Sequence, residues 1–172
     1  MRLSEEIREL LQQGRETELV DRAVADARVV RPLLARLYDP DDEVRDRAAR
    51  VLGHAAASHP ELGREVVRRL MWALNDEAAT NGVHGIAALG QIGRRAPDLL
   101  APHVSALARM AWDHGLRLPI LDALAEVAWS SPELVAPQLA AIEPHVDASR
   151  AGEDVAWRNL TNAVEGDETH GC

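Results

Sequence analysis

The sequence predicts an all-α fold, a right-handed α-solenoid of about ten helices in which helix pairs stack in line. Two observations support this class. The spacing of the stretch DDEVRDRAARVLGHAA, residues 41–56, recurs about every 36 residues down to Leu160. The apolar residues are mainly Ala, Leu and Val, with no Phe, and such small side chains suit closely packed helices.

The first 30 residues are expected to form an N-terminal helical cap. One helix runs from Ser4, which we expect to act as its N-cap, to about Gln13, and a second covers roughly residues 17–28. A repeat array needs such a cap because its first repeat would otherwise expose an apolar face. We expect four helix pairs to follow over residues 31–166, and then a flexible tail, residues 167–172.

The first helix of each pair is marked at its ends. The later pairs begin with a proline followed by an acid, at Pro60, Pro97 and Pro132. Proline lacks an N–H group, and a carboxylate favours the positive end of the helix dipole, so this dipeptide indicates a helix start. The expected ends of the first helices are acidic residues about 36 positions apart: Asp39, Asp76, Asp113 and Asp147.

The second helix of each pair carries a leucine that we expect at one equivalent interior position. These residues are Leu52, Leu89, Leu124 and Leu160. On the second helix expected over about residues 80–95, a turn of 100° per residue places His84, Ala88 and Gln91 on the outward side. Gly82, Gly85 and Gly93 fall on the apolar side, and close helix packing is preferred over a bound ligand as their explanation.

The stretch Asp42-Glu-Val-Arg45, followed by Ala48, Ala49, Leu52 and Gly53, resembles the second-helix signature of HEAT repeats, in particular the phycobilisome-lyase HEAT-like subgroup. The resemblance covers roughly residues 31–165. Residues 70–92 are also similar to uncharacterised prokaryotic HEAT proteins with a run like NDESGGIGWGAPEAMGEI, although the Ser-Gly-Gly and Trp-Gly-Ala-Pro parts are replaced. The resemblance implies a HEAT/armadillo-like superhelix whose second helices line the concave side, and it implies no particular activity.

Composition and motifs exclude several functional classes. All 19 basic residues are Arg, which removes the P-loop, Schiff-base and kinase-strand lysines. The net charge of −9 argues against broad binding to a phosphate backbone. Neither G-x-S-x-G nor H-E-x-x-H occurs. We therefore expect no catalytic set and no cofactor.

The chain ends hold no predicted anchor or metal site. No signal peptide or long apolar run is present, so we expect a cytoplasmic protein. The C-terminal stretch GDETHGC includes the single cysteine, Cys172, and three other potential metal ligands. A flexible tail is preferred over weak metal binding there.

The candidate partner-binding residues lie at outward positions of the second helices. They are Arg47, Arg50, His54, His84, Gln91, Asp122, Glu126 and Arg158. Their charges run from basic through neutral and acidic to mixed. Solenoids use such concave surfaces for extended contacts with proteins, and the alternative is a solvated face.

A possible polar cluster surrounds the start of the helix expected at about residue 80. Its members are Asn75, Asp76, Glu77, Asn81 and His84. A histidine near carboxylates is suited to proton transfer or metal binding. Helix capping is the preferred interpretation.

The four tryptophans are expected to pack in the core. Trp157 aligns with the apolar positions Ile86 and Leu121, whereas Trp72, Trp112 and Trp129 lie near expected helix ends. Stacking of these indoles on a ligand is the alternative.

These features together predict a non-enzymatic scaffold or adaptor that binds another protein. A cofactor-handling accessory or lyase-like protein, acting on a tetrapyrrole or a metal, is the alternative that the subgroup name implies. Nucleic-acid binding is a third, less favoured by the acidic charge.

Overall fold

The computed structural model describes residues 2–76 and 82–166, and all regular structure within these ranges is helical. The α-helices are α1 (Leu3–Gln12), α2 (Glu16–Ala25), α3 (Val30–Arg36), α4 (Asp42–Ser58), α5 (Pro60–Asn75), α6 (His84–Arg95), α7 (Pro97–Leu100), α8 (Val104–Arg109), α9 (Arg117–Ser130), α10 (Pro132–Val135), α11 (Leu139–Ile142) and α12 (Glu153–Glu165). Short 3-10 segments are η1 (Ala27–Val29), η2 (Ala101–His103), η3 (Met110–Trp112), η4 (Ala136–Gln138) and η5 (Glu143–His145). None of the described helices is long and apolar enough to cross a membrane.

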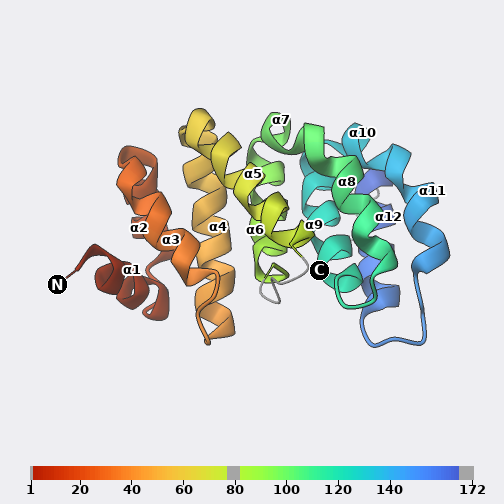
Figure 1. The fold of residues 1–172 in the computed structure, drawn as a ribbon, viewed down its shortest axis with the longest axis horizontal. Helices are drawn as coiled ribbons and strands as arrows, with labels where there is room; N and C mark the ends of the chain where they lie inside the picture. The colour runs from red at the N-terminus through yellow and green to blue at the C-terminus, as the bar shows by residue number, and fades with distance from the viewer. Residues whose placement is uncertain (1, 77–81, 167–172) are drawn as a thin grey trace.

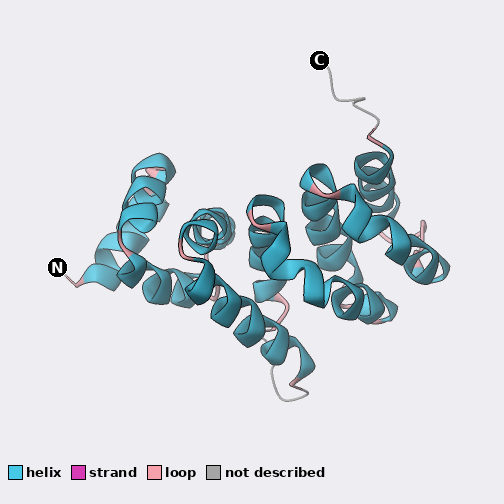
Figure 2. Ribbon diagram, turned by 90° about the horizontal axis from the view of Figure 1, so that it is seen from above, coloured by secondary structure: helices cyan, strands magenta, loops and turns pink. Residues whose placement is uncertain are grey.

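The helices follow one another along the long axis of the molecule (Figure 1) and are joined by short loops (Figure 2). The second helices form one continuous stack, in which α4 packs against α6, α6 against α9, and α9 against α12. Helix α2 extends this stack at the N-terminal end by packing against α4. The predicted all-α solenoid is confirmed.

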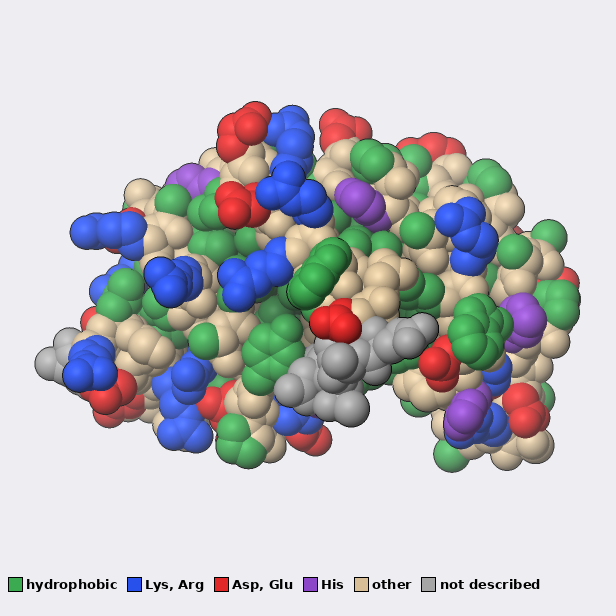
Figure 3. Space-filling view, in the orientation of Figure 1, with side chains coloured by type: hydrophobic (Ala, Val, Ile, Leu, Met, Phe, Trp, Pro, Cys, Tyr) green, Lys and Arg blue, Asp and Glu red, His purple; other side chains and the backbone are tan. Residues whose placement is uncertain are grey.

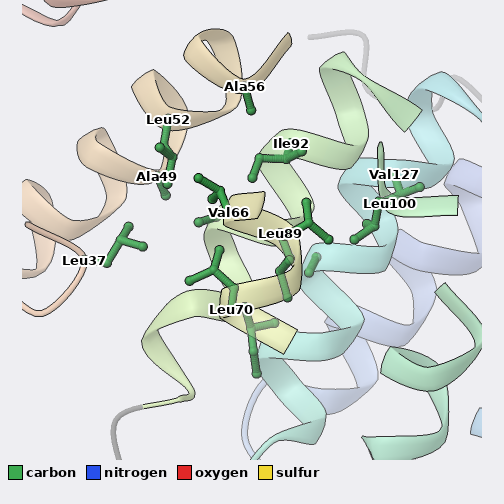
Figure 4. Close-up of a cluster of buried hydrophobic side chains, with 14 of the residues drawn as sticks. Leu37, Ala49, Leu52, Ala56, Val66, Leu70, Leu89, Ile92, Leu100 and Val127 are labelled. Carbon is green, nitrogen blue, oxygen red and sulfur yellow. The ribbon is translucent and has the colours of Figure 1, made fainter. Parts of the chain in front are cut away.

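The core runs through the whole stack. The predicted interior leucines are all fully buried, and these are Leu52, Leu89, Leu124 and Leu160. Figure 4 shows Leu52 of α4, Leu89 of α6 and Val127 of α9 within one apolar cluster that crosses successive pairs. The equivalence of the four leucines is therefore confirmed.

Glycine allows the second helices to approach closely. A Cβ atom on Gly53 of α4 would lie 2.7 Å from the backbone oxygen of Gln91 on α6, and one on Gly90 would lie 2.8 Å from Cα of Ala123 on α9. Helix contact therefore accounts for both glycines, because no side chain fits in these spaces.

The first helices start where predicted, but two of them are interrupted. Helices α5, α7 and α10 each begin at a proline followed by an acid. In the third and fourth pairs, Pro102 and Pro137 divide the first helix into short α and 3-10 segments. An interior proline has this effect because it lacks the N–H donor and clashes with the preceding turn. Helix α5 contains no interior proline and continues unbroken.

Two expected helix starts are wrong in detail. Helix α1 begins at Leu3, so Ser4 lies within the first turn. The carboxylate of Glu5 there accepts a hydrogen bond from the backbone N–H of Arg2 at 3.1 Å. Helix α6 begins at His84 rather than near residue 80.

Three of the four tryptophans contradict the prediction of core packing. Trp72, Trp112 and Trp129 are 69%, 66% and 44% exposed, whereas Trp157 is partly buried and packs against the core. Ala88, which was expected on the outward side of α6, is fully buried. A helix in the middle of a stack has neighbours on two flanks, so its buried surface is wider than one stripe.

Candidate functional site

A groove of about 440 Å³ crosses the outer surfaces of α4, α6 and α9. Four of the predicted partner-binding residues line it: His84, Gln91, Asp122 and Glu126. We call this the second-helix groove. It is built by successive repeats, so no single helix pair contains it.

Helix periodicity directs these side chains into the groove. His84 is the first residue of α6, and Gln91 lies two turns later on the same side. Asp122 and Glu126 are one turn apart on α9. The opposite sides of both helices are buried in the core, and the polar side chains consequently remain at the surface.

Asp122 carries an unpaired charge in the second-helix groove. Like Asp46, which also lines the groove, it makes no hydrogen bond or ion pair with any residue that the structure describes. Although the residue is exposed, nearby protein atoms displace water from its carboxylate. This desolvation raises the pKa of Asp122, and the negative charge of Glu126 raises it further.

Three other polar residues of the second-helix groove, Glu126, Gln91 and His84, have neighbours within the chain. Glu126 forms an ion pair with Arg94, with 2.5 Å between Oε2 and Nη1. The side-chain oxygen of Gln91 accepts a hydrogen bond from Arg95 at 2.6 Å. The ring of His84 meets that of Tyr38 edge-on, with 6.3 Å between the ring centroids.

Arg47 and Arg50 connect α4 to the N-terminal cap. Nη1 of Arg47 donates to the backbone oxygen of Leu11 at 2.7 Å, and its guanidinium also pairs with Glu43 at 2.9 Å. Arg50 makes two hydrogen bonds of 2.9 Å to the carboxylate of Glu16 on α2. This bidentate contact raises the pKa of Arg50. Both guanidiniums therefore join elements of the fold.

His54 and Arg158 lie outside the lining of the second-helix groove. Burial lowers the pKa of the half-buried His54, and the positive charge of Arg95 lowers it further, so both effects favour the neutral imidazole. Arg158 pairs with Asp154, one turn earlier on α12, at 3.2 Å.

Sequence reasoning expected α4 to contribute Arg47, Arg50 and His54, but the structure places other α4 residues in the second-helix groove. Arg45 and Asp46 line it, whereas the expected Arg47 does not. The α4 surface that faces the groove is therefore displaced by one position from the one projected.

The second predicted cluster is only partly described. The side-chain amide of Asn75 donates to the backbone oxygen of Met71 at 2.8 Å, and Asp76 is the C-cap residue of α5. Glu77 and Asn81 lie outside the described residues, as does the tail with Cys172. Within residues 2–76 and 82–166, no three His, Cys, Asp or Glu side chains are placed to hold a metal ion.

The stacked helix pairs define an α-solenoid with a polar groove across its second helices. A model of the HEAT-repeat family matches residues 30–125, more than half of the chain, and the protein belongs to this family. An uncharacterised protein of Archaeoglobus fulgidus is 34% identical over 67 residues, which cover 39% of this chain and 36% of that relative. This chain thus matches about a third of the relative's length. No solved structure matches.

Proposed function

We propose that this HEAT-repeat protein is a non-enzymatic scaffold that binds another protein through its second helices, with the second-helix groove at the centre of the contact. Asp122 is the observation that carries the proposal. Its carboxylate has lost part of its hydration without gaining a partner within the described chain. A cationic group from a bound protein would offset that loss.

The second-helix groove is too small to form the whole contact with a partner protein. A stable protein complex buries about 800 Å² on each partner, which is more than one groove provides. The contact therefore extends along the stack from His54 on α4 to Arg158 on α12. This surface includes six of the eight predicted residues. The other two, Arg47 and Arg50, hold α4 against α1 and α2 through their contacts with Leu11 and Glu16.

Affinity capture from the native cell with Asp122→Arg tests the proposal. Reversing the charge in the groove places like charges together, and we expect recovery of the bound protein to fall at least about tenfold. Asp21→Arg is the matched control, because Asp21 is exposed on α2 and makes no hydrogen bond or ion pair within the described chain. Circular dichroism of both variants checks the helical fold. Unchanged recovery with Asp122→Arg would contradict the proposal.

A further inference from the structure

A second groove lies in the layer of first helices, between α3 and α5. Two cavities of about 400 and 570 Å³ adjoin there, and Arg31, Leu34 and Arg69 line both. The cavities therefore form one continuous depression, which we call the first-helix groove. It shares no lining residue with the second-helix groove.

The floor of the first-helix groove is aliphatic. Val66 and Leu70 of α5 are each 3% exposed and form its base, with the partly buried Leu34 and Leu62 beside them. Trp72, which is 69% exposed, stands at one end. The apolar surface that the groove offers to water therefore comes from Leu34, Leu62 and Trp72, which lie above this buried base.

The rim of the first-helix groove is basic. Arg31 and Arg69 are exposed, and neither makes a hydrogen bond or ion pair with any residue in the described ranges. Arg68, adjacent on α5, is likewise exposed and unpaired within those ranges. Figure 3 shows arginine side chains gathered over α3 and α5 beside apolar surface. The whole chain has a net charge of −9, so the rim of this groove is locally positive on a protein that is negative overall.

We propose that the first-helix groove binds an acidic peptide segment with bulky apolar side chains, supplied by a partner protein. The aliphatic floor accepts the apolar side chains. The guanidiniums of Arg31 and Arg69 can each donate two parallel hydrogen bonds to a carboxylate, and their positive charge attracts an acidic segment.

An acidic peptide fits better than a nucleic acid. Glu65 also lines the groove and would repel a continuous phosphate backbone. Strand binding relies on a longer basic track with aromatic stacking platforms along it. Here the exposed aromatic residues, Tyr38 and Trp72, line only one of the two cavities, and the base is formed by Val66 and Leu70. Because the two grooves share no residue, this inference is independent of the proposed function.

The test uses a labelled synthetic peptide of Glu and Leu, with leucine at every third or fourth position, and fluorescence anisotropy with the full chain. We expect saturable binding that weakens at least about tenfold in the double variant Arg31→Glu/Arg69→Glu. Trp72→Ala should weaken binding severalfold without unfolding the chain, because the indole is exposed. The same peptide with Lys in place of Glu should not bind.

The matched control is Arg2→Glu/Arg109→Glu, which makes the same change in net charge at exposed positions outside both grooves. Both this control and Asp122→Arg should bind the peptide as the wild type does. Absence of saturable binding, or equal loss in the control, would overturn the proposal. So would tighter binding of a single-stranded oligonucleotide, or self-association of the chain that Arg31→Glu/Arg69→Glu abolishes.

Discussion

Asp26 and Asp122 show how neighbouring groups move the pKa of a carboxylate in opposite directions. Asp26 accepts hydrogen bonds from the side chain and the backbone N–H of Arg28, and these contacts lower its pKa to about 2. Asp122 lacks such donors within the described chain, and desolvation raises its pKa. Ionisation of Asp26 therefore favours the folded state, whereas ionisation of Asp122 disfavours it.

Asp26→Asn should reduce stability in a pH-dependent way. The folded pKa of Asp26 lies below the ordinary value of 3.8, so its contribution is complete above that value and is lost as the pH falls towards 2. We expect the difference in unfolding free energy between wild type and variant to be largest at neutral pH and to shrink in acid. Urea unfolding followed by circular dichroism measures it. Asp21→Asn is the control, and a difference that persists unchanged at pH 2 would refute the assignment.

Single residues were predicted well where one helix face decides their environment. Helical spacing correctly placed Leu52 and Leu89 in the interior. It failed for Ala88, because α6 is covered on two flanks. Helical periodicity would have placed Trp72 at the surface, because the buried positions of α5 include Val67 and Leu70 but not Trp72. Large apolar area alone was a poor guide to burial.

A buried ion pair joins the last two second helices. Nη1 of Arg117 on α9 lies 3.2 Å from Oε2 of Glu153 on α12, and the two side chains are 8% and 3% exposed. Arg117 also donates to the backbone oxygens of Ala111 and Trp112, and Glu153 accepts from the backbone N–H of Asp147 at 2.9 Å. The pair thus connects α9, α12 and the ends of two first helices.

Glu153→Ala should be strongly destabilising, because it leaves the buried guanidinium of Arg117 without its counter-charge. Loss of one partner of a buried pair costs about 3–5 kcal/mol. Urea unfolding at neutral pH measures this loss. Asp154→Ala is the adjacent control, since its pair with Arg158 is exposed and is worth at most about 1 kcal/mol. Equal effects of the two variants would contradict the structural role of the buried pair.

For whole elements, the sequence predicts the presence of each helix better than it predicts how neighbouring helices are oriented against one another. Proline-acid dipeptides correctly gave three helix starts. The interruptions at Pro102 and Pro137 were also present in the sequence and were overlooked. The second-helix groove was only half predictable, because its lining depends on how α4, α6 and α9 are rotated against one another. Helical periodicity fixes a face on each helix and leaves that rotation undetermined.

The whole molecule is a linear array, in which each layer contacts mainly its neighbours. Leu89 belongs to α6, which lies between α4 and α9, whereas Leu160 belongs to α12, which packs against α9 and α10. Both side chains are fully buried. The two leucines are equally buried, but the helices around Leu160 can move into a cavity more easily than the helices around Leu89.

Leu89→Ala should cost more than Leu160→Ala. Replacing a buried leucine by alanine lowers the free energy of unfolding by about 2–5 kcal/mol, and the value depends on how far the surrounding residues move into the cavity. We expect about 4 kcal/mol at Leu89, which is enclosed on two flanks, and about 2 kcal/mol at Leu160, where the last described helix can shift inward. Chemical denaturation followed by circular dichroism compares them. Equal costs, or a larger cost at Leu160, would show that the layers do not act as a linear series.

The exposure of Trp72, Trp112 and Trp129 has an optical consequence for anyone who handles this protein. Indoles already in contact with water emit at long wavelength in the native state, and denaturation changes their surroundings little. Only Trp157 moves from a partly apolar environment into solvent. Intrinsic emission will therefore give a small and misleading transition, while the same water-facing indoles are well placed to be quenched by added iodide or acrylamide.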